Sequence, residues 1–90
     1  MISYRDNAAE HRFEWDEGGF LSFADYAERG GVRAILHVET PAEGRGQGYA
    51  AKLMNAIIAD ARERGLKLQP LCSYAVAHFR RHPQAHDVLA

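Results

Sequence analysis

From His11 to Glu39 polar and apolar residues alternate with a period of two, which is typical of half-buried strands, whereas Met1–Glu10 shows no clear period. Phe13 and Trp15 fall on one face of the first such segment, and polar residues fall on the other. The segment Phe20–Ala27 follows and is rich in aromatic residues. Paired glycines at 18–19 and 30–31 supply tight turns. The pattern predicts an antiparallel meander, preceded over Met1–Glu10 by either a short lead-in strand or a loose end.

The third strand of this meander is expected at Val32–Glu39. Strict alternation divides its side chains into two sets that face opposite ways. One face is then formed by Val32, Ala34, Leu36 and Val38, and the other by Arg33, Ile35, His37 and Glu39.

From Gly48 to Arg64 apolar residues recur at helical spacing, which predicts a long helix. Gly65 follows directly and is a typical helix terminator. A fourth strand is expected at Leu66–Leu71, with Pro70 favouring an edge position or a bulge, and a second helix at Ser73–Arg81. Strand, helix and strand form a βαβ unit with parallel strands. The predicted fold class is therefore α/β (α+β): a meander, a βαβ unit and a C-terminal helix.

The start of the long helix lacks a capping residue. Between Gly44 and Ala51 no Ser, Thr, Asp or Asn is available to accept the free N–H groups of the first turn. Arg45 and Lys52 add positive charge on either side. Free N–H groups, the positive end of the helix dipole and two cations together predict an anion site, which suits a phosphate group.

Two well-known phosphate loops do not match this segment. A Walker A loop needs Lys followed by Ser or Thr after its last glycine, where this chain has Tyr49 and Ala50. A dinucleotide fingerprint needs a glycine at the position that Tyr49 occupies.

Composition restricts the function further. The chain has 90 residues, which we read as one domain spanning 1–90, with 26% charged and 47% hydrophobic residues and a net charge of −1. That balance argues against a nucleic-acid surface. A single cysteine, Cys72, cannot form an internal disulfide, and no signal peptide or membrane-length apolar run is seen. We therefore expect a cytoplasmic protein without a membrane partner.

The run Arg45-Gly46-Gln47-Gly48-Tyr49-Ala50 resembles the acetyl-coenzyme A loop of the GNAT acetyltransferase superfamily. Together with His37-Val38-Glu39-Thr40, Pro70-Leu71-Cys72-Ser73-Tyr74 and His82-Pro83, it resembles the small single-domain GNAT-like proteins of the YjdJ type. The resemblance implies a minimal GNAT-like fold and an acetyltransferase that uses acetyl-coenzyme A as co-substrate and an amine as acceptor. It implies cofactor binding by Val38, Arg45, Gly46, Gln47, Gly48, Tyr49 and Ala50.

The candidate catalytic residues lie near the same edge of the predicted sheet. Cys72 is either a small buried hydrophobe or a nucleophile, because the amino terminus of a helix favours the thiolate. Tyr74 resembles the family's acid that protonates the departing thiolate, and its alternative is a packed residue at the pocket rim. His37 and Glu39 are candidates to accept the proton of the amine, or are solvated polar residues.

Three histidines and two arginines near the end of the sequence suggest further possible sites. His78, His82 and His86 have a helical spacing that zinc ligands can use, but Pro83 interrupts the helix, and we expect no metal. Arg80 and Arg81 are candidates for the 3′-phosphate of coenzyme A or form a solvated face. The alternatives to an enzyme are a coenzyme A or acyl-coenzyme A binding module without turnover and a phosphate-dependent interaction domain.

Overall fold

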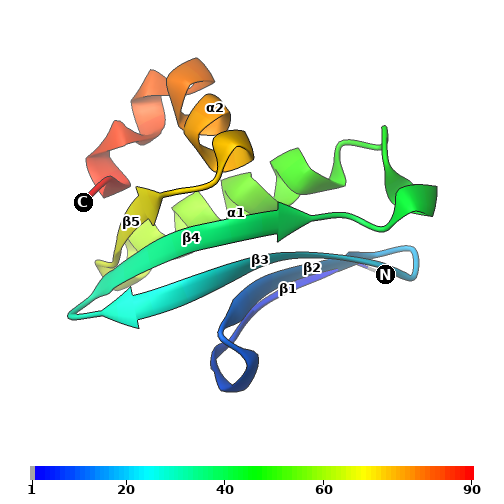
Figure 1. The fold of residues 1–90 in the computed structure, drawn as a ribbon, viewed down its shortest axis with the longest axis horizontal. Helices are drawn as coiled ribbons and strands as arrows, with labels where there is room; N and C mark the ends of the chain where they lie inside the picture. Colours follow the sequence, from blue (N-terminus) through cyan, green and yellow to red (C-terminus); the bar gives the residue numbers. More distant parts are fainter. Residues whose placement is uncertain (1) are drawn as a thin grey trace.

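The computed structural model describes residues 2–90 and contains a five-stranded mixed sheet with two α-helices and three short 3₁₀ segments (Figure 1). The predicted α+β class is confirmed. The elements are β1 (Ile2–Asn7), η1 (Ala8–Glu10), β2 (Arg12–Glu17), β3 (Phe20–Arg29), β4 (Val32–Glu39), η2 (Ala42–Gly44), α1 (Tyr49–Arg64), β5 (Lys67–Pro70), α2 (Ser73–Arg81) and η3 (Pro83–Val88).

The sheet has the strand order β1-β2-β3-β4-β5, and the first four strands form the predicted antiparallel meander. The segment that was expected to be either a lead-in strand or a loose end is the edge strand β1, which pairs with β2 along its whole length. The turns after β2 and β3 use glycines with positive φ, as their sequence indicates.

A β-bulge in β4 overturns the predicted division of its two faces. Tyr26 pairs with Ile35, but the next residue of β3, Asp25, pairs with His37, so Leu36 has no partner on β3. One extra residue reverses the alternation beyond it. Val38, opposite the fully buried Ala24, therefore lies on the same face as Ile35, while His37 and Glu39 lie on the face of Leu36.

The strands β4 and β5 are parallel, as the βαβ reading predicts, and then separate. Their pairing runs from Val32 opposite Lys67 to Ile35 opposite Pro70, and ends there. The amide of Leu71 still donates to the carbonyl of Ile35, at 3.0 Å. Beyond that point β4 continues toward the glycine loop, and the chain leaving β5 turns toward α2 (Figure 1). Pro70 ends an edge strand, as expected.

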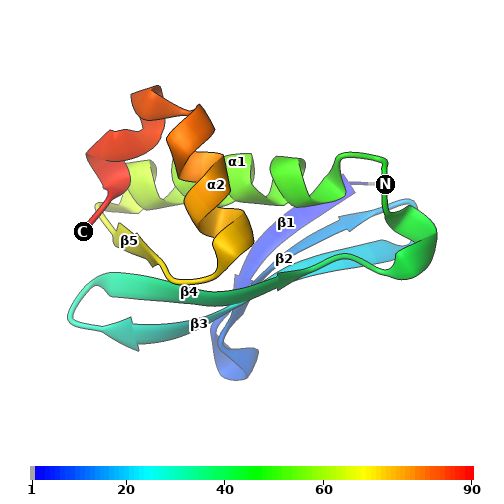
Figure 2. The ribbon, with the colours of Figure 1, turned by 45° about the horizontal axis from the view of Figure 1, so that its top comes forward.

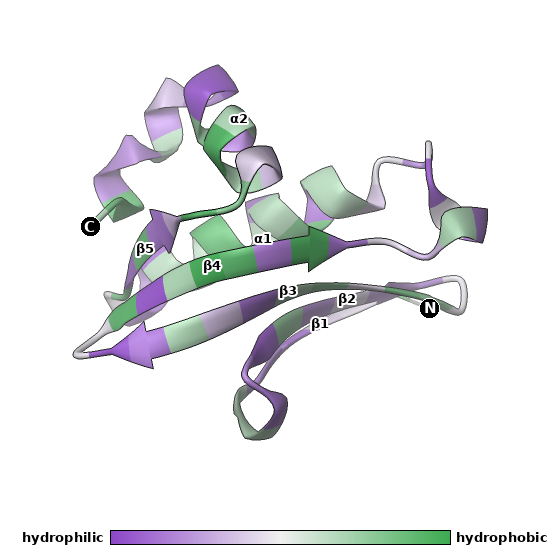
Figure 3. Ribbon diagram, viewed as in Figure 1, coloured by the Kyte–Doolittle hydropathy of each residue, from purple (hydrophilic) through white to green (hydrophobic). Residues whose placement is uncertain are grey.

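Both α-helices lie on one side of the sheet (Figure 2). The buried stripe of α1 consists of Leu53, Met54, Ile57, Ile58 and Ala61. This stripe packs on inward residues of β2 to β5, including Phe13, Ala24, Ile35 and Leu68, while α2 adds Ala75 and Phe79. Apolar residues are accordingly concentrated along β4 and α1 (Figure 3). Burying such side chains contributes about 1.5–3 kcal/mol each before entropic costs.

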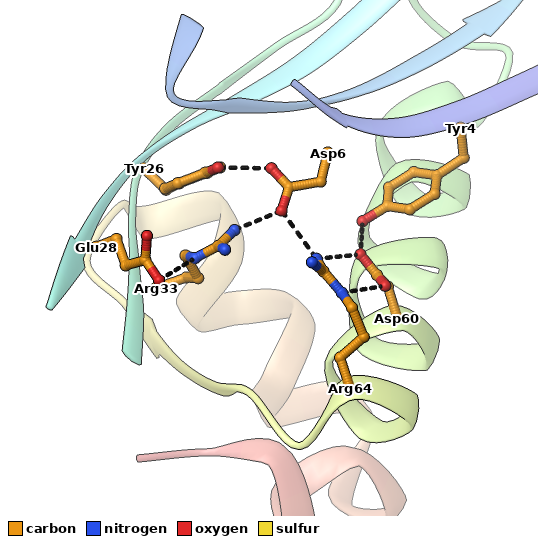
Figure 4. A network of polar contacts seen from close by, with 7 residues as sticks. All are labelled: Tyr4, Asp6, Tyr26, Glu28, Arg33, Asp60 and Arg64. Carbon is orange, nitrogen blue, oxygen red and sulfur yellow. Dashed lines mark hydrogen bonds and ion pairs between the residues drawn. The ribbon is translucent and has the colours of Figure 1, made fainter. Parts of the chain in front are cut away.

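A polar network fastens the edge strand β1 to α1 (Figure 4). The carboxylate of Asp6 accepts hydrogen bonds from the hydroxyl of Tyr26, from Arg33 at 2.6 Å and from Arg64 at 2.8 Å. Arg64 also binds Asp60, which accepts a hydrogen bond from Tyr4. Burial opposes ionisation of Asp6, but these three donors outweigh it and lower its pKa. The carboxylate of Asp6 is therefore ionised at neutral pH.

Across the described residues 2–90, no helix combines the length and the apolar character that crossing a membrane requires.

Candidate functional site

The glycine loop between β4 and α1 is shaped by two glycines in the left-handed region. Gly46 has φ +86° and Gly48 has φ +80°, values that residues with a Cβ rarely adopt. No heavy atom lies within 4 Å of the Cβ position at either glycine, so the space beside the backbone is open. The loop therefore presents bare backbone to this open space.

The amide groups at the start of α1 lie beside this open space. Gly48 is the N-cap residue, and no side chain accepts a hydrogen bond there. Among the described residues, the amides of Gly46, Gly48, Tyr49, Ala50 and Ala51 have no protein acceptor, whereas the amide of Gln47 is 3.4 Å from the carbonyl of Gly44. The uncapped helix start is confirmed, and five N–H donors are free to bind an anion.

A pocket of about 310 Å³ lies over these donors. It is lined by Thr40, Gly44, Arg45, Gly46, Gly48, Tyr49, Ala50, Ala51 and Tyr74. Thr40, Gly44 and Ala51 are not among the predicted cofactor-binding residues, whereas the predicted Val38 and Gln47 do not line this pocket. A Cβ on Gly44 would lie 3.1 Å from the ring of Tyr49 and 3.2 Å from the ring of Phe20, so this glycine allows the two rings to stack across the loop.

The two cations beside the loop are not equally available. Lys52 donates to both carboxylate oxygens of Glu17, each at 3.1 Å, so its charge is largely compensated. Arg45 lines the pocket and makes one long hydrogen bond of 3.3 Å to the carbonyl of Thr40. The positive character of the site therefore comes from the backbone donors and Arg45 rather than from Lys52.

Cys72 is the N-cap residue of α2. Its sulfur accepts a hydrogen bond from the amide of Ala75 at 3.4 Å, and the residue is half-buried against the core. The position at a helix amino terminus is as predicted. Cys72 does not line the loop pocket.

Tyr74 is the catalytic candidate that the structure brings to the loop, because it lines the same pocket as the free amides. Burial raises the pKa of Tyr74, with a smaller opposing effect of Arg81. The hydroxyl is thus protonated at neutral pH and can donate a proton.

His37 and Glu39 lie on the opposite face of the sheet from α1, as a consequence of the bulge. Nε2 of His37 is 2.9 Å from a carboxylate oxygen of Glu39, and both side chains are about half exposed, at 55% and 51%. Asp25 is directly opposite His37 on β3. A carboxylate that holds one ring nitrogen leaves the other free to accept a proton.

The three histidines of the C-terminal segment bind protein groups. Buried His78 contacts Asn55 at 3.2 Å, and burial, together with His82 and Arg81, lowers its pKa. His82 and His86 each bond a backbone carbonyl through a ring nitrogen, at 2.7 Å. Within residues 2–90, no three His, Cys, Asp or Glu side chains form a cluster suited to a metal ion.

The structure thus combines an α+β fold, a parallel strand pair that separates after Ile35 and Pro70, and a pocket lined by backbone amides without a protein acceptor. The sequence profile of a GCN5-related N-acetyl-transferase family matches residues 12–88, and the chain belongs to this family. That assignment confirms the resemblance drawn from the glycine loop at the level of the superfamily, while the narrower YjdJ type remains a prediction. No curated protein sequence matches the chain.

Proposed function

We propose that the protein transfers the acetyl group of acetyl-coenzyme A to an amine. The observation that carries the proposal is the set of five free amides, from Gly46 to Ala51, inside the loop pocket. The residues fit a diphosphate because its oxygens are strong acceptors, the glycines leave room for it, and Arg45 adds charge. Arg80 and Arg81, exposed in the last turn of α2, are candidates for the 3′-phosphate.

The bound co-substrate supplies an activated acetyl group as a thioester. From the loop, its pantetheine arm would run along β4 beside Val38 into the gap beyond Ile35 and Pro70, where the parallel pairing ends. There the backbone of β4 lacks a β5 partner and is free to bond a ligand in the manner of an added strand.

In the proposed step His37 accepts a proton from the amine, with Glu39 fixing its ring. The bond from the amine nitrogen to the carbonyl carbon forms, and the carbon–sulfur bond breaks. Tyr74 donates its proton to the departing sulfur. The products are an amide and coenzyme A with a free thiol.

Cys72 defines a second route to the same products. Its thiol would take the acetyl group first and pass it to the amine. The place of Cys72 at the start of α2, where Sγ accepts a hydrogen bond from the amide of Ala75, supports this route, whereas the position of Tyr74 in the loop pocket supports direct transfer. Intact-mass measurement after incubation with acetyl-coenzyme A separates the two routes, because only the route through Cys72 leaves an acetyl group on that residue.

A coenzyme A binding module without turnover is the second candidate. Within the described residues, only the three-residue η1 and His11 separate β1 from β2, so no helix there walls an acceptor site. Isothermal titration with coenzyme A, combined with thiol release in the presence of an amine panel, tests both. Binding with thiol release supports the enzyme, binding alone supports the module, and absence of binding contradicts both.

A further inference from the structure

A second and larger pocket of about 600 Å³ lies on the face of the sheet opposite α1. Its floor is apolar and is formed by Ala27, Ala34, Leu36 and Leu71 from three neighbouring strands or their ends. Glu28, Arg29 and Gln69 add polar groups, and Val32 and Ala90 complete the lining. The loop pocket shares no lining residue with it.

This pocket reaches the point where β4 and β5 separate. Ile35 and Pro70 form the last parallel pair. Leu36 is the next residue along β4, and Leu71 is the first residue after β5. Both leucines line the pocket and are strongly exposed, at 48% and 56%. Two large apolar side chains left in water beside a gap that the reacting group would enter suit contact with a ligand.

The bulge continues the same face with charged residues. Because Leu36 is the extra residue, its neighbour His37 lies on the pocket side of the sheet, followed by Glu39 and faced by Asp25. An apolar floor is thus followed directly by a histidine between two carboxylates. Carboxylates attract an ammonium group, and the histidine can remove its proton.

We propose that the outer-face pocket binds the acceptor, and that the acceptor is a small primary amine with an apolar body. This inference rests on the proposed acetyl transfer. The apolar body packs on Ala34, Leu36 and Leu71, and the amine points toward His37 and the carboxylates of Glu39 and Asp25. From Val32 to Leu36 the floor extends roughly 13 Å, at about 3.3 Å per residue, which is enough for a compact aromatic or alkyl amine.

The first test follows backbone amide resonances of the protein, free and saturated with coenzyme A, during titration with 2-phenylethylamine. We expect shifts at Ala27, Ala34 and Leu36. Shifts confined to other surfaces, or none in either form, overturn the inference.

The second test narrows the pocket without changing the loop. Ala34→Phe places a ring on the floor, and Ala59→Phe adds the same ring at an exposed position on α1 as a control. For 2-phenylethylamine we expect KM to rise at least tenfold in Ala34→Phe only, with coenzyme A affinity unchanged in both variants. If Ala34→Phe acts like the control, or if only a lysine-containing peptide is acetylated, the inference is wrong.

Failure of the acceptor site can be distinguished from failure of the proposed acetyl transfer. If the wild-type protein does not bind coenzyme A, the proposed function is refuted. The titration of the free protein with the amine still tests binding to the outer-face pocket. Coenzyme A binding without amine shifts at the pocket refutes the acceptor site alone.

Discussion

Ile35 and Val38 lie on the same face of β4, although they are three positions apart and a regular strand would place them on opposite faces. The relationship arises because Leu36 is bulged out of the pairing with β3. It keeps Val38 against the core and turns His37 and Glu39 to the other side of the sheet. The parallel pairing with β5 ends at the same place, after Ile35 and Pro70. One irregular residue thus coincides with the opening on which the proposed chemistry depends.

Replacing Gly48 by alanine tests the left-handed loop. Gly48 has φ +80° and Gly31 has φ +83°, and neither has a heavy atom near the Cβ position. We expect Gly48→Ala and Gly31→Ala to lose similar stability, roughly 1–2 kcal/mol, because each forces a Cβ into the left-handed region. Only Gly48→Ala should weaken coenzyme A binding in a calorimetric titration. Equal affinities in the two variants would show that the loop does not hold the ligand.

A carboxylate at position 51 should affect folding and binding in opposite directions. Ala51 lies in the first turn of α1 and lines the loop pocket. Ala51→Glu should stabilise the helix by about 0.3–1 kcal/mol through the dipole. It should also weaken coenzyme A binding about tenfold or more, since charges roughly 4 Å apart near a surface repel by ~1–4 kcal/mol. Thermal unfolding and titration measure the two effects, and Ala59→Glu, exposed further along α1, is the control.

Replacing His37, the proposed general base, should lower the turnover rate without changing the affinity for coenzyme A. His37 is exposed, and its hydrogen bond to Glu39 joins two side chains at the surface. We expect His37→Asn to reduce kcat by roughly 10²–10⁴-fold, the range typical of general bases. Coenzyme A affinity and the melting temperature should stay unchanged. Glu39→Gln should give a smaller loss, because it only orients the ring. An unchanged rate in His37→Asn would assign proton removal to another group.

The buried carboxylates predict a dependence of stability on pH. Burial opposes ionisation of Glu14, but Arg12, Asn7 and Arg5 outweigh it and lower its pKa, as the donors around Asp6 do for that residue. A folded-state pKa below the unfolded value contributes stability above the unfolded value, about 4 for such groups, and this contribution disappears as pH falls through the folded pKa. Urea unfolding from pH 7 to pH 2 should show a steady loss of stability below about pH 4.

Asp6→Asn should remove much of that acid dependence and destabilise the protein at neutral pH. The variant leaves Arg33, whose side chain is 8% exposed, without its buried counter-charge. We expect a loss of about 3–5 kcal/mol in the free energy of unfolding at pH 7. Asp16→Asn is the matched control, because the side chain of Asp16 makes no hydrogen bond or ion pair with any other residue from 2 to 90. Similar stability losses in both variants would contradict the network's role.

The sequence predicted the elements and the uncapped start of α1 better than the faces of β4. The paired glycines, the helical stripe and the uncapped start after Gly48 are local signals, and each produces its effect within a few residues. No glycine marks the bulge at Leu36, and the alternation is broken there only by Ile35, an apolar residue on the otherwise polar face. The bulge is visible only in the pairing with β3. The ion pair between Lys52 and Glu17 joins residues 35 positions apart, and no local sequence pattern indicates this pairing.

The most direct measurement follows the amide resonances of Gly46, Gly48, Tyr49, Ala50 and Ala51 while the protein is titrated with coenzyme A and, separately, with pantetheine, which lacks the diphosphate. The account predicts large shifts of these amides with coenzyme A and much smaller ones with pantetheine. Unchanged resonances at these five residues with saturating coenzyme A, or equal shifts with both compounds, would contradict diphosphate binding by the loop.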